Sequence, residues 1–299
     1  MQNRMTFRWL GVAGFELGVA AQTLLVDPFF TRPPFRKVLM GRVQPDETLV
    51  EKNISDGDFI LVTHAHYDHL MDVPAAARKT GAVVFGSENS CKLLEICGLP
   101  PANLRRIRAG DQLDLGIFQV KVFAAQHLRL PLRLYHPGPL PSKLQPPLRL
   151  WDYRMDESFS FQIDVAGRRI LLWSGQSVAG ASPADILLTY FMSTPSFYEE
   201  LLDRVRPLLV IPLHWDNLFR PLSRPLKPSW RPPRLGFPMW LRSRPEAFAR
   251  IIARHPVSAQ VLIPEIFKRY DLDHEAPALI KRPAQILPVK DGFDHSDGE

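Results

Sequence analysis

Short apolar segments separated by turn residues occupy the first third of the chain. Phe15, Leu17 and Val19 alternate with other residues, which is typical of a strand with one buried face. Residues 58–62 form a compact apolar run, as expected for a strand buried on both faces. The pattern predicts strands over residues 5–10, 14–19, 22–26, 58–62 and 82–85 and helices over 75–79 and 89–96.

Turn signals divide the middle of the chain into two hairpins, followed by alternating strands and helices. Gly116 and Gly167 mark the turns, and strands are predicted over residues 112–123, 158–165, 168–172, 185–189 and 208–211. The capping-box pattern Ser-x-x-Glu at residues 196–199 and 243–246 predicts helices that reach Arg206 and about Arg254. Two similar halves of this kind predict a layered α/β fold with mixed sheets in one domain over residues 1–299.

Two segments without clear periodicity, residues 128–154 and 219–245, interrupt this pattern. They contain 13 of the 29 prolines and 12 basic residues but only one acidic residue. Because the chain as a whole has a net charge of +6, the remainder is net negative. Prolines reduce the entropy lost on ordering, so we expect both segments to form ordered walls of a positively charged active-site cleft.

Composition excludes several classes of protein. Hydrophobic residues make up 45% of the chain, which is enough for a core and excludes a disordered chain. No apolar run approaches the roughly 20 residues of a membrane span. The two cysteines, Cys91 and Cys97, cannot form a disulfide framework, and a reducing compartment fits. We therefore expect a cytoplasmic protein.

Four potential metal ligands lie within the hexapeptide His64-Ala-His66-Tyr-Asp68-His69, directly after the predicted strand 58–62. His64 and His66 are two residues apart, so in an extended backbone they point to the same side and can hold one ion. Asp68 and His69 follow after the chain turns and can face a neighbouring position. Imidazole and carboxylate are ligands typical of zinc sites, so the hexapeptide predicts metal binding.

Two further histidines follow strands in the same way. His127 comes at the end of the strand predicted over residues 120–125, and His214 comes at the end of the apolar run 208–213. A single histidine of this kind is usually a packed or surface residue. The repeated context makes both of them candidate ligands contributed by distant parts of the sequence.

The sequence His-x-His-x-Asp-His after a strand resembles the signature of the metallo-β-lactamase superfamily of metal-dependent hydrolases. The resemblance extends from Trp9-Leu-Gly11 through Asp27-Pro28 to His214-Trp-Asp216. The first and last of these motifs look similar to the branch that includes ascorbate-phosphate lactonases and the phospholipase D that acts on N-acylphosphatidylethanolamines. The resemblance implies a four-layer αββα sandwich of two mixed β-sheets flanked by helices.

The resemblance also implies roles for particular residues. One metal would be held by His64, His66 and His127, and a second by Asp68, His69 and His214. Asp27 matches an aspartate that supports the site from behind the ligands, or it is a turn residue before Pro28. Asp216 is either a residue that orients a ligand or a surface residue.

The segment Gly175-Gln176-Ser177 departs from the family pattern, which has Gly-Asp-Ser/Thr with a carboxylate that bridges both metals. A neutral carboxamide is a poor bridging ligand, and one lost negative charge weakens the binding of two neighbouring cations. Three alternatives follow: two metals bridged only by hydroxide, one firmly bound metal, or a fold that has lost hydrolytic activity. Val12, where many relatives carry histidine, is a second departure.

The predicted activity is hydrolysis by a metal-activated water, because a bound metal lowers the pKa of water to about 7. Asp68 and His214 are the candidate catalytic residues, with Asp68 orienting the nucleophile. Zinc is the expected metal, with manganese or iron as alternatives. The bond would be an ester, lactone or phosphodiester.

Substrate charge is predicted from the two basic segments. They favour a small anionic substrate, for which the candidate binding residues are Arg129, Arg133, Arg149, Arg220 and Arg224. Alternatively, the two segments are solvated loops, and their arginines only aid solubility. The competing functions are a nucleic-acid or phospholipid phosphodiesterase, where the partner is a polyanion or a membrane surface, and a non-catalytic metal-binding module. The sequence is also compatible with a homo-oligomer.

Overall fold

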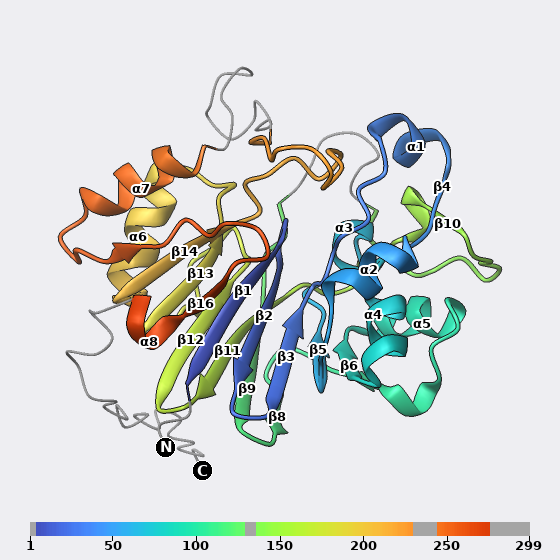
Figure 1. The fold of residues 1–299 in the computed structure, drawn as a ribbon, viewed down its shortest axis with the longest axis horizontal. Helices are drawn as coiled ribbons and strands as arrows, with labels where there is room; N and C mark the ends of the chain where they lie inside the picture. Colours follow the sequence, from blue (N-terminus) through green and yellow to red (C-terminus); the bar gives the residue numbers. More distant parts are fainter. Residues whose placement is uncertain (1–3, 129–135, 230–243, 276–299) are drawn as a thin grey trace, which may run out of the picture.

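Two seven-stranded β-sheets form the centre of the computed structural model, which describes residues 4–128, 136–229 and 244–275 (Figure 1). The strand order of the first sheet is β16-β1-β2-β3-β5-β6-β7, and that of the second is β15-β14-β13-β12-β11-β9-β8. Each sheet is antiparallel in one half and parallel in the other. The predicted sandwich of two mixed sheets flanked by helices is confirmed.

The first sheet is built mainly from the N-terminal part of the chain. Its antiparallel half begins with two tight hairpins, and its parallel half is connected through helices. One C-terminal strand, β16, joins its edge beside β1. The strands are β1 (Met5–Gly11), β2 (Gly14–Val19), β3 (Gln22–Val26), β5 (Phe59–Leu61), β6 (Val83–Gly86), β7 (Leu104–Arg106) and β16 (Arg269–Asp271).

The second sheet repeats this organisation. Every residue of β13 and β14 is buried, as expected for central parallel strands covered on both faces. The hairpin β11–β12 turns at Ala166 and Gly167, which both have positive φ angles, as a type I′ turn requires. The strands are β8 (Gln112–Leu115), β9 (Phe118–Ala124), β11 (Phe159–Val165), β12 (Arg168–Trp173), β13 (Ile186–Tyr190), β14 (Leu209–Leu213) and β15 (Gln260–Val261).

Helices lie on the two outer sides of the sandwich. Figure 1 shows α6 and α7 beside the second sheet and α2, α4 and α5 beside the first. The helices are α1 (Phe35–Met40), α2 (Glu47–Asn53), α3 (Tyr67–Leu70), α4 (Val73–Thr80), α5 (Glu88–Ile96), α6 (Pro195–Val205), α7 (Pro245–Ala253) and α8 (Leu272–Glu275), with 3₁₀ turns η1 (Pro101–Asn103) and η2 (Leu150–Asp152). No described helix is long and apolar enough to cross a membrane.

A small two-stranded ribbon, separate from the two large sheets, connects two distant segments of the chain. Strand β10 (Leu148–Arg149) pairs antiparallel with β4 (Arg42–Val43), which directly follows α1. The pairing places β10, in the segment 128–154, beside α1 (Figure 1). The sequence pattern did not predict α1, β4 or this pairing.

The predicted strands and helices are confirmed, with two corrections at helix starts. Helix α6 begins two residues earlier than the capping box predicted, because Thr194 accepts the capping hydrogen bond from the Phe197 N–H and Pro195 occupies the first turn. The N-cap of α7 is Arg244, and Ser243 lies outside the described residues. Cys91 and Cys97 are both free thiols. The single domain over the full length stays a prediction.

Candidate metal centre

The hexapeptide at residues 64–69 connects β5 to the short helix α3. His66 is the N-cap residue of α3, so the backbone is extended before it and helical after it. This change of direction separates the four potential ligands into two pairs, as the sequence predicted. His127 follows β9 and His214 follows β14, so both come to the hexapeptide from the second sheet.

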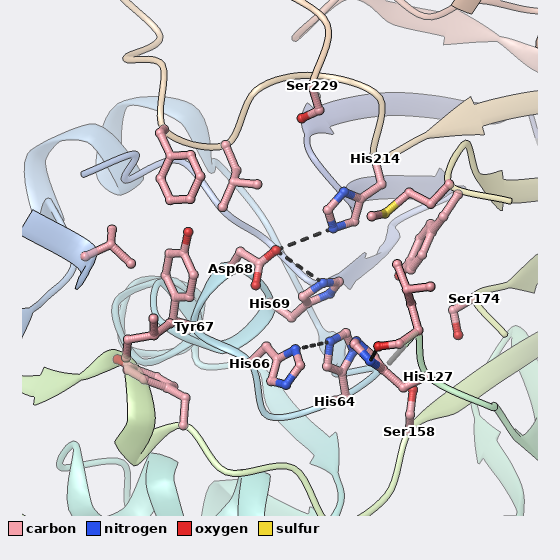
Figure 2. Close-up of a pocket in the computed structure, with 18 of the residues that line it drawn as sticks. His64, His66, Tyr67, Asp68, His69, His127, Ser158, Ser174, His214 and Ser229 are labelled. Carbon is pink, nitrogen blue, oxygen red and sulfur yellow. Dashed lines mark hydrogen bonds and ion pairs between the residues drawn. The ribbon is translucent and has the colours of Figure 1, made fainter. Parts of the chain in front are cut away.

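His64, His66 and His127 form the first group of potential ligands, with one nitrogen of each ring within 4.8 Å of the others. His64 Nε2 lies 3.1 Å from His66 Nδ1, and both rings face His127 (Figure 2). Burial lowers the pKa of His64, that of His66 to about 3 and that of His127 to about 4. The three imidazoles are therefore neutral at pH 7, which is the form that binds metals.

Asp68, His69 and His214 form the second group, whose ligand atoms also lie within 4.8 Å of one another. Asp68 Oδ2 lies 3.6 Å from His69 Nε2 and 3.4 Å from His214 Nε2. Burial alone would raise the pKa of Asp68, but His69 and His214 outweigh it and hold that pKa well below its usual value. The carboxylate is therefore ionised, as a ligand must be.

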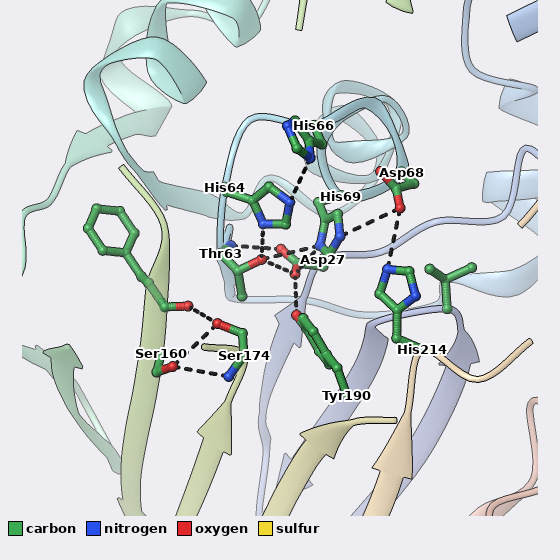
Figure 3. Close-up of polar contacts among 12 residues, drawn as sticks. Asp27, Thr63, His64, His66, Asp68, His69, Ser160, Ser174, Tyr190 and His214 are labelled. Atoms are coloured by element: carbon green, nitrogen blue, oxygen red, sulfur yellow. Dashed lines mark hydrogen bonds and ion pairs between the residues drawn. The ribbon is translucent and has the colours of Figure 1, made fainter. Parts of the chain in front are cut away.

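Asp27 lies beneath the second group, after β3, and its carboxylate is completely buried (Figure 3). It accepts hydrogen bonds from the backbone N–H and the hydroxyl of Thr63, and Oδ2 lies 2.7 Å from His69 Nδ1. Burial lowers the pKa of His69, but Asp27 and Asp68 outweigh it and the net pKa is raised. A proton held on Nδ1 leaves Nε2 as the ligand atom, the usual arrangement of a supported metal-binding histidine.

His214 is held in an unusual backbone conformation, with φ at +57°. Its N–H donates to the carbonyl of Val12, which is itself left-handed at φ +49°. The carboxylate of Asp216 accepts from the Val12 N–H and pairs with Arg32 at 2.7 Å, and both side chains are completely buried. The structure thus excludes the alternative that Asp216 is a surface residue; it holds the backbone that positions His214.

The chemistry of the donor sets fits divalent metal ions. With bonds of about 2.0–2.2 Å, two ligand atoms on one ion lie up to about 4.2 Å apart. The separations of up to 4.8 Å in each group are close to that span. Five imidazoles and one ionised carboxylate converge from three strand ends, those of β5, β9 and β14, so the residues present can hold one or two such ions.

Both groups open into one cavity of about 260 Å³ (Figure 2). Among the described residues, none that lines it is arginine or lysine. The wall consists largely of apolar and aromatic side chains, with Ser158, Ser174, Gln176 and Ser229 as the other polar residues. The described part of the wall therefore does not form a positively charged cleft.

The predicted substrate-binding arginines lie elsewhere. Arg220 donates to the Pro225 carbonyl, and neither it nor Arg224 is among the lining residues. Arg149 lies over the Trp151 ring, 5.4 Å from its centre. Arg129 and Arg133 are outside the described residues. Substrate binding by these arginines stays a prediction, without support from the described geometry.

Gln176 lines the same cavity as the two ligand groups. Its side-chain oxygen accepts a hydrogen bond of 2.8 Å from the Ser193 hydroxyl, and its backbone N–H donates to the Gln126 carbonyl. The carboxamide therefore has a structural partner, and the choice among the three alternatives for the metal count stays open.

Sequence reasoning missed four residues that contribute to the site. Thr63 bridges Asp27 to the histidines, and the Tyr190 hydroxyl donates to Asp27 at 3.3 Å. Tyr190 ends a buried strand, so the strand-end pattern that singled out His127 would have found it. The Tyr67 hydroxyl is buried at the cavity and has no hydrogen-bond partner among the described residues. No sequence pattern identified Arg32, because its partner Asp216 is distant in sequence.

Comparisons with known proteins agree with this geometry. A family model described as "Beta-lactamase superfamily domain" matches residues 22–144. A "UPF0173 metal-dependent hydrolase" of Methylobacterium nodulans is 32% identical over 41% of this chain and 48% of its own length. Another, of Polynucleobacter asymbioticus, is 26% identical over 72% of this chain and 76% of its own. The matched part thus spans about half of one relative and three quarters of the other.

Solved structures show the same fold. A metallo hydrolase, Igni18, from Ignicoccus hospitalis superposes with a TM-score of 0.58 at 17% identity and covers 89% of this chain and 97% of its own. The metallo-beta-lactamase fold protein YhfI from Bacillus subtilis gives a TM-score of 0.53 at 11% identity, with 90% and 99% coverage. At these identities the likeness concerns the fold alone.

Proposed function

Because this chain belongs to the metallo-β-lactamase superfamily, we propose that it is a metal-dependent hydrolase that cleaves a carboxylic ester or lactone bond of a small molecule. The observation that carries the proposal is the pair of three-residue ligand groups facing one cavity. In the reaction, the oxygen of water bonds to the acyl carbon, the acyl–oxygen bond breaks, and the leaving oxygen takes up a proton.

Divalent ions at these groups would polarise the carbonyl and lower the pKa of water. Asp68 stays ionised at neutral pH, so its carboxylate can accept a hydrogen bond from the attacking water and orient it. Asp27 fixes the ring of His69 through Nδ1. Burial raises the pKa of Tyr67, so its phenol stays protonated and can donate a hydrogen bond to a substrate oxygen.

Metal quantification on the purified protein, together with a panel of esters and lactones, tests the proposal. We expect His66→Ala and His69→Ala to lose metal and turnover together. His255→Ala is the matched control, because His255 pairs with Asp203 and does not line the cavity. Turnover retained by a metal-free variant would refute metal-dependent hydrolysis.

Gln176→Asp distinguishes the alternatives for the metal count. If the natural protein holds one metal and the variant two, the glutamine defines a one-metal site. If both hold two, the carboxylate bridge is dispensable. Metal bound without turnover of any ester would instead favour the non-catalytic alternative, for which the hydrogen bond from Ser193 to Gln176 is the supporting observation.

A further inference from the structure

An apolar wall faces the ligand groups across the cavity, and most of it comes from two segments. Helix α1 contributes Phe35, Val38 and Leu39, and the chain after β14 contributes Leu218 and Phe219. The rings of Phe35 and Phe219 pack edge to face with their centres 5.1 Å apart. The two segments thus form one continuous apolar surface beside the metal ligands.

The same surface continues to the solvent. Among the exposed large apolar side chains of the described chain, Phe35 and Leu39 line the cavity, and Trp151 follows Leu150, which also lines it. Met40, the next residue of α1, is exposed as well but is not part of the lining. Scattered exposed apolar residues need no explanation, but a cluster at the mouth of a cavity is typical of a ligand site.

We propose that this cavity binds the apolar acyl or alkyl group of a neutral ester or lactone, with the group seated against α1 and Phe219. The proposal rests on the proposed function, since it places the bond to be cleaved at the ligand groups. The cavity volume of about 260 Å³ is many times the roughly 10–15 Å³ that one water needs, so it leaves room for a short acyl chain, for which a six-carbon group is the test case.

No arginine or lysine is among the described lining residues, and this determines whether neutral or anionic substrates are preferred. With the ester bond at the ligand groups, a carboxylate at the far end of the chain would leave water for the apolar surface of α1 and Phe219, where no arginine or lysine is among the described lining residues, which is costly. Each methylene of a neutral chain gains from the same surface, by up to about fourfold in affinity. A neutral chain should therefore be preferred over an anionic one of equal length.

Hydrolysis of three p-nitrophenyl esters tests this selectivity in the metal-loaded protein: the acetate, the hexanoate and the mono-ester of adipic acid, which has the length of the hexanoate but ends in a carboxylate. We expect kcat/KM to be at least about tenfold higher for the hexanoate than for either of the others. Equal values for all three, or preference for the adipate, would overturn the proposal while leaving the hydrolase function intact.

Calorimetric binding of hexanamide, acetamide and adipamic acid measures the cavity without turnover. Hexanamide should bind most tightly. If no ester is hydrolysed but this order holds, the proposed function fails and the apolar site stands. If adipamic acid binds as tightly as hexanamide, the apolar site is refuted whatever the turnover.

Two neighbouring residues of α1 provide a matched pair of variants. Both Leu39 and Met40 are exposed, so neither substitution threatens folding, but only Leu39 lines the cavity. Leu39→Ser should weaken hexanamide binding and lower the hexanoate-to-acetate ratio by about three- to tenfold. Met40→Ser should change neither; equal effects of the two variants would contradict the assignment of the wall.

Discussion

Arg32 and Asp216 form an ion pair whose two side chains have no exposed surface. Arg32→Met removes one charge and leaves the other buried, which typically costs about 3–5 kcal/mol. The 2.7 Å contact lacks the direction of a good hydrogen bond, so we expect the lower end, about 3 kcal/mol. Since natural domains have about 5–15 kcal/mol in total, the loss should be large and easily measured.

The double variant Arg32→Met/Asp216→Asn separates the ion pair from the packing. Asparagine keeps an oxygen that can accept from the Val12 N–H, and no unpaired charge remains. We therefore expect the double variant to be less destabilised than the sum of the single variants by about 2 kcal/mol or more. His214 depends on Val12, so the single variant should also lose metal affinity at the second ligand group.

Urea unfolding in the presence of a chelator measures these free energies without a contribution from metal binding. Arg78→Met is the control, because Arg78 pairs with Glu47 on the surface and such pairs contribute about 0–1 kcal/mol. A cost below about 1 kcal/mol for Arg32→Met, or additive single variants, would refute the reasoning.

Three further predictions concern single residues. Burial raises the pKa of Asp72 to about 6, above its unfolded value, so its contribution to stability is present below about pH 4 and is lost as the pH rises through 6. The unfolding free energy of the natural protein should thus fall by roughly 3 kcal/mol relative to Asp72→Asn between pH 4 and 7, whereas a constant difference would contradict the shift. Tyr67→Phe should lower kcat/KM about two- to tenfold at unchanged metal content, and no loss would remove the phenol from the reaction. Gly11→Ala places a Cβ 2.1 Å from Arg32 and should destabilise by at least about 2 kcal/mol more than Gly110→Ala, whose φ is similar but whose surroundings are open; equal costs would show that Arg32 moves freely.

The strands could be predicted because their apolar periodicity is local, and the two groups of potential ligands because four of the six residues lie in one hexapeptide. His127 and His214 were found from their strand-end context, which a sheet edge brings together. Arg32 could not be found, because its partner Asp216 is supplied by the tertiary fold alone. The N-cap of α6 was predicted at Ser196 but is Thr194, although Pro195 is a residue typical of the first turn of a helix.

Charge counts in the two proline-rich segments predicted a positive cleft, yet the described wall is apolar. Composition gives the number of charges in a segment but not the direction of each side chain. Neither Arg220 nor Arg224 lines the cavity, whereas Leu150 and Phe219 from the same segments do. Helix α1, which completes the wall, lacks the length and capping signals that reveal a helix in sequence.

Each ligand group draws on both sheets. His64 and His66 follow a strand of the first sheet and His127 one of the second, and the second group is divided in the same way by His214. An ion in either group would act as a cross-link between the two halves of the sandwich. Because such an ion binds the folded chain and not the unfolded one, it stabilises the packing of the sheets by mass action. Removing metal with a chelator should therefore lower the unfolding free energy of the whole sandwich, in addition to emptying the active site.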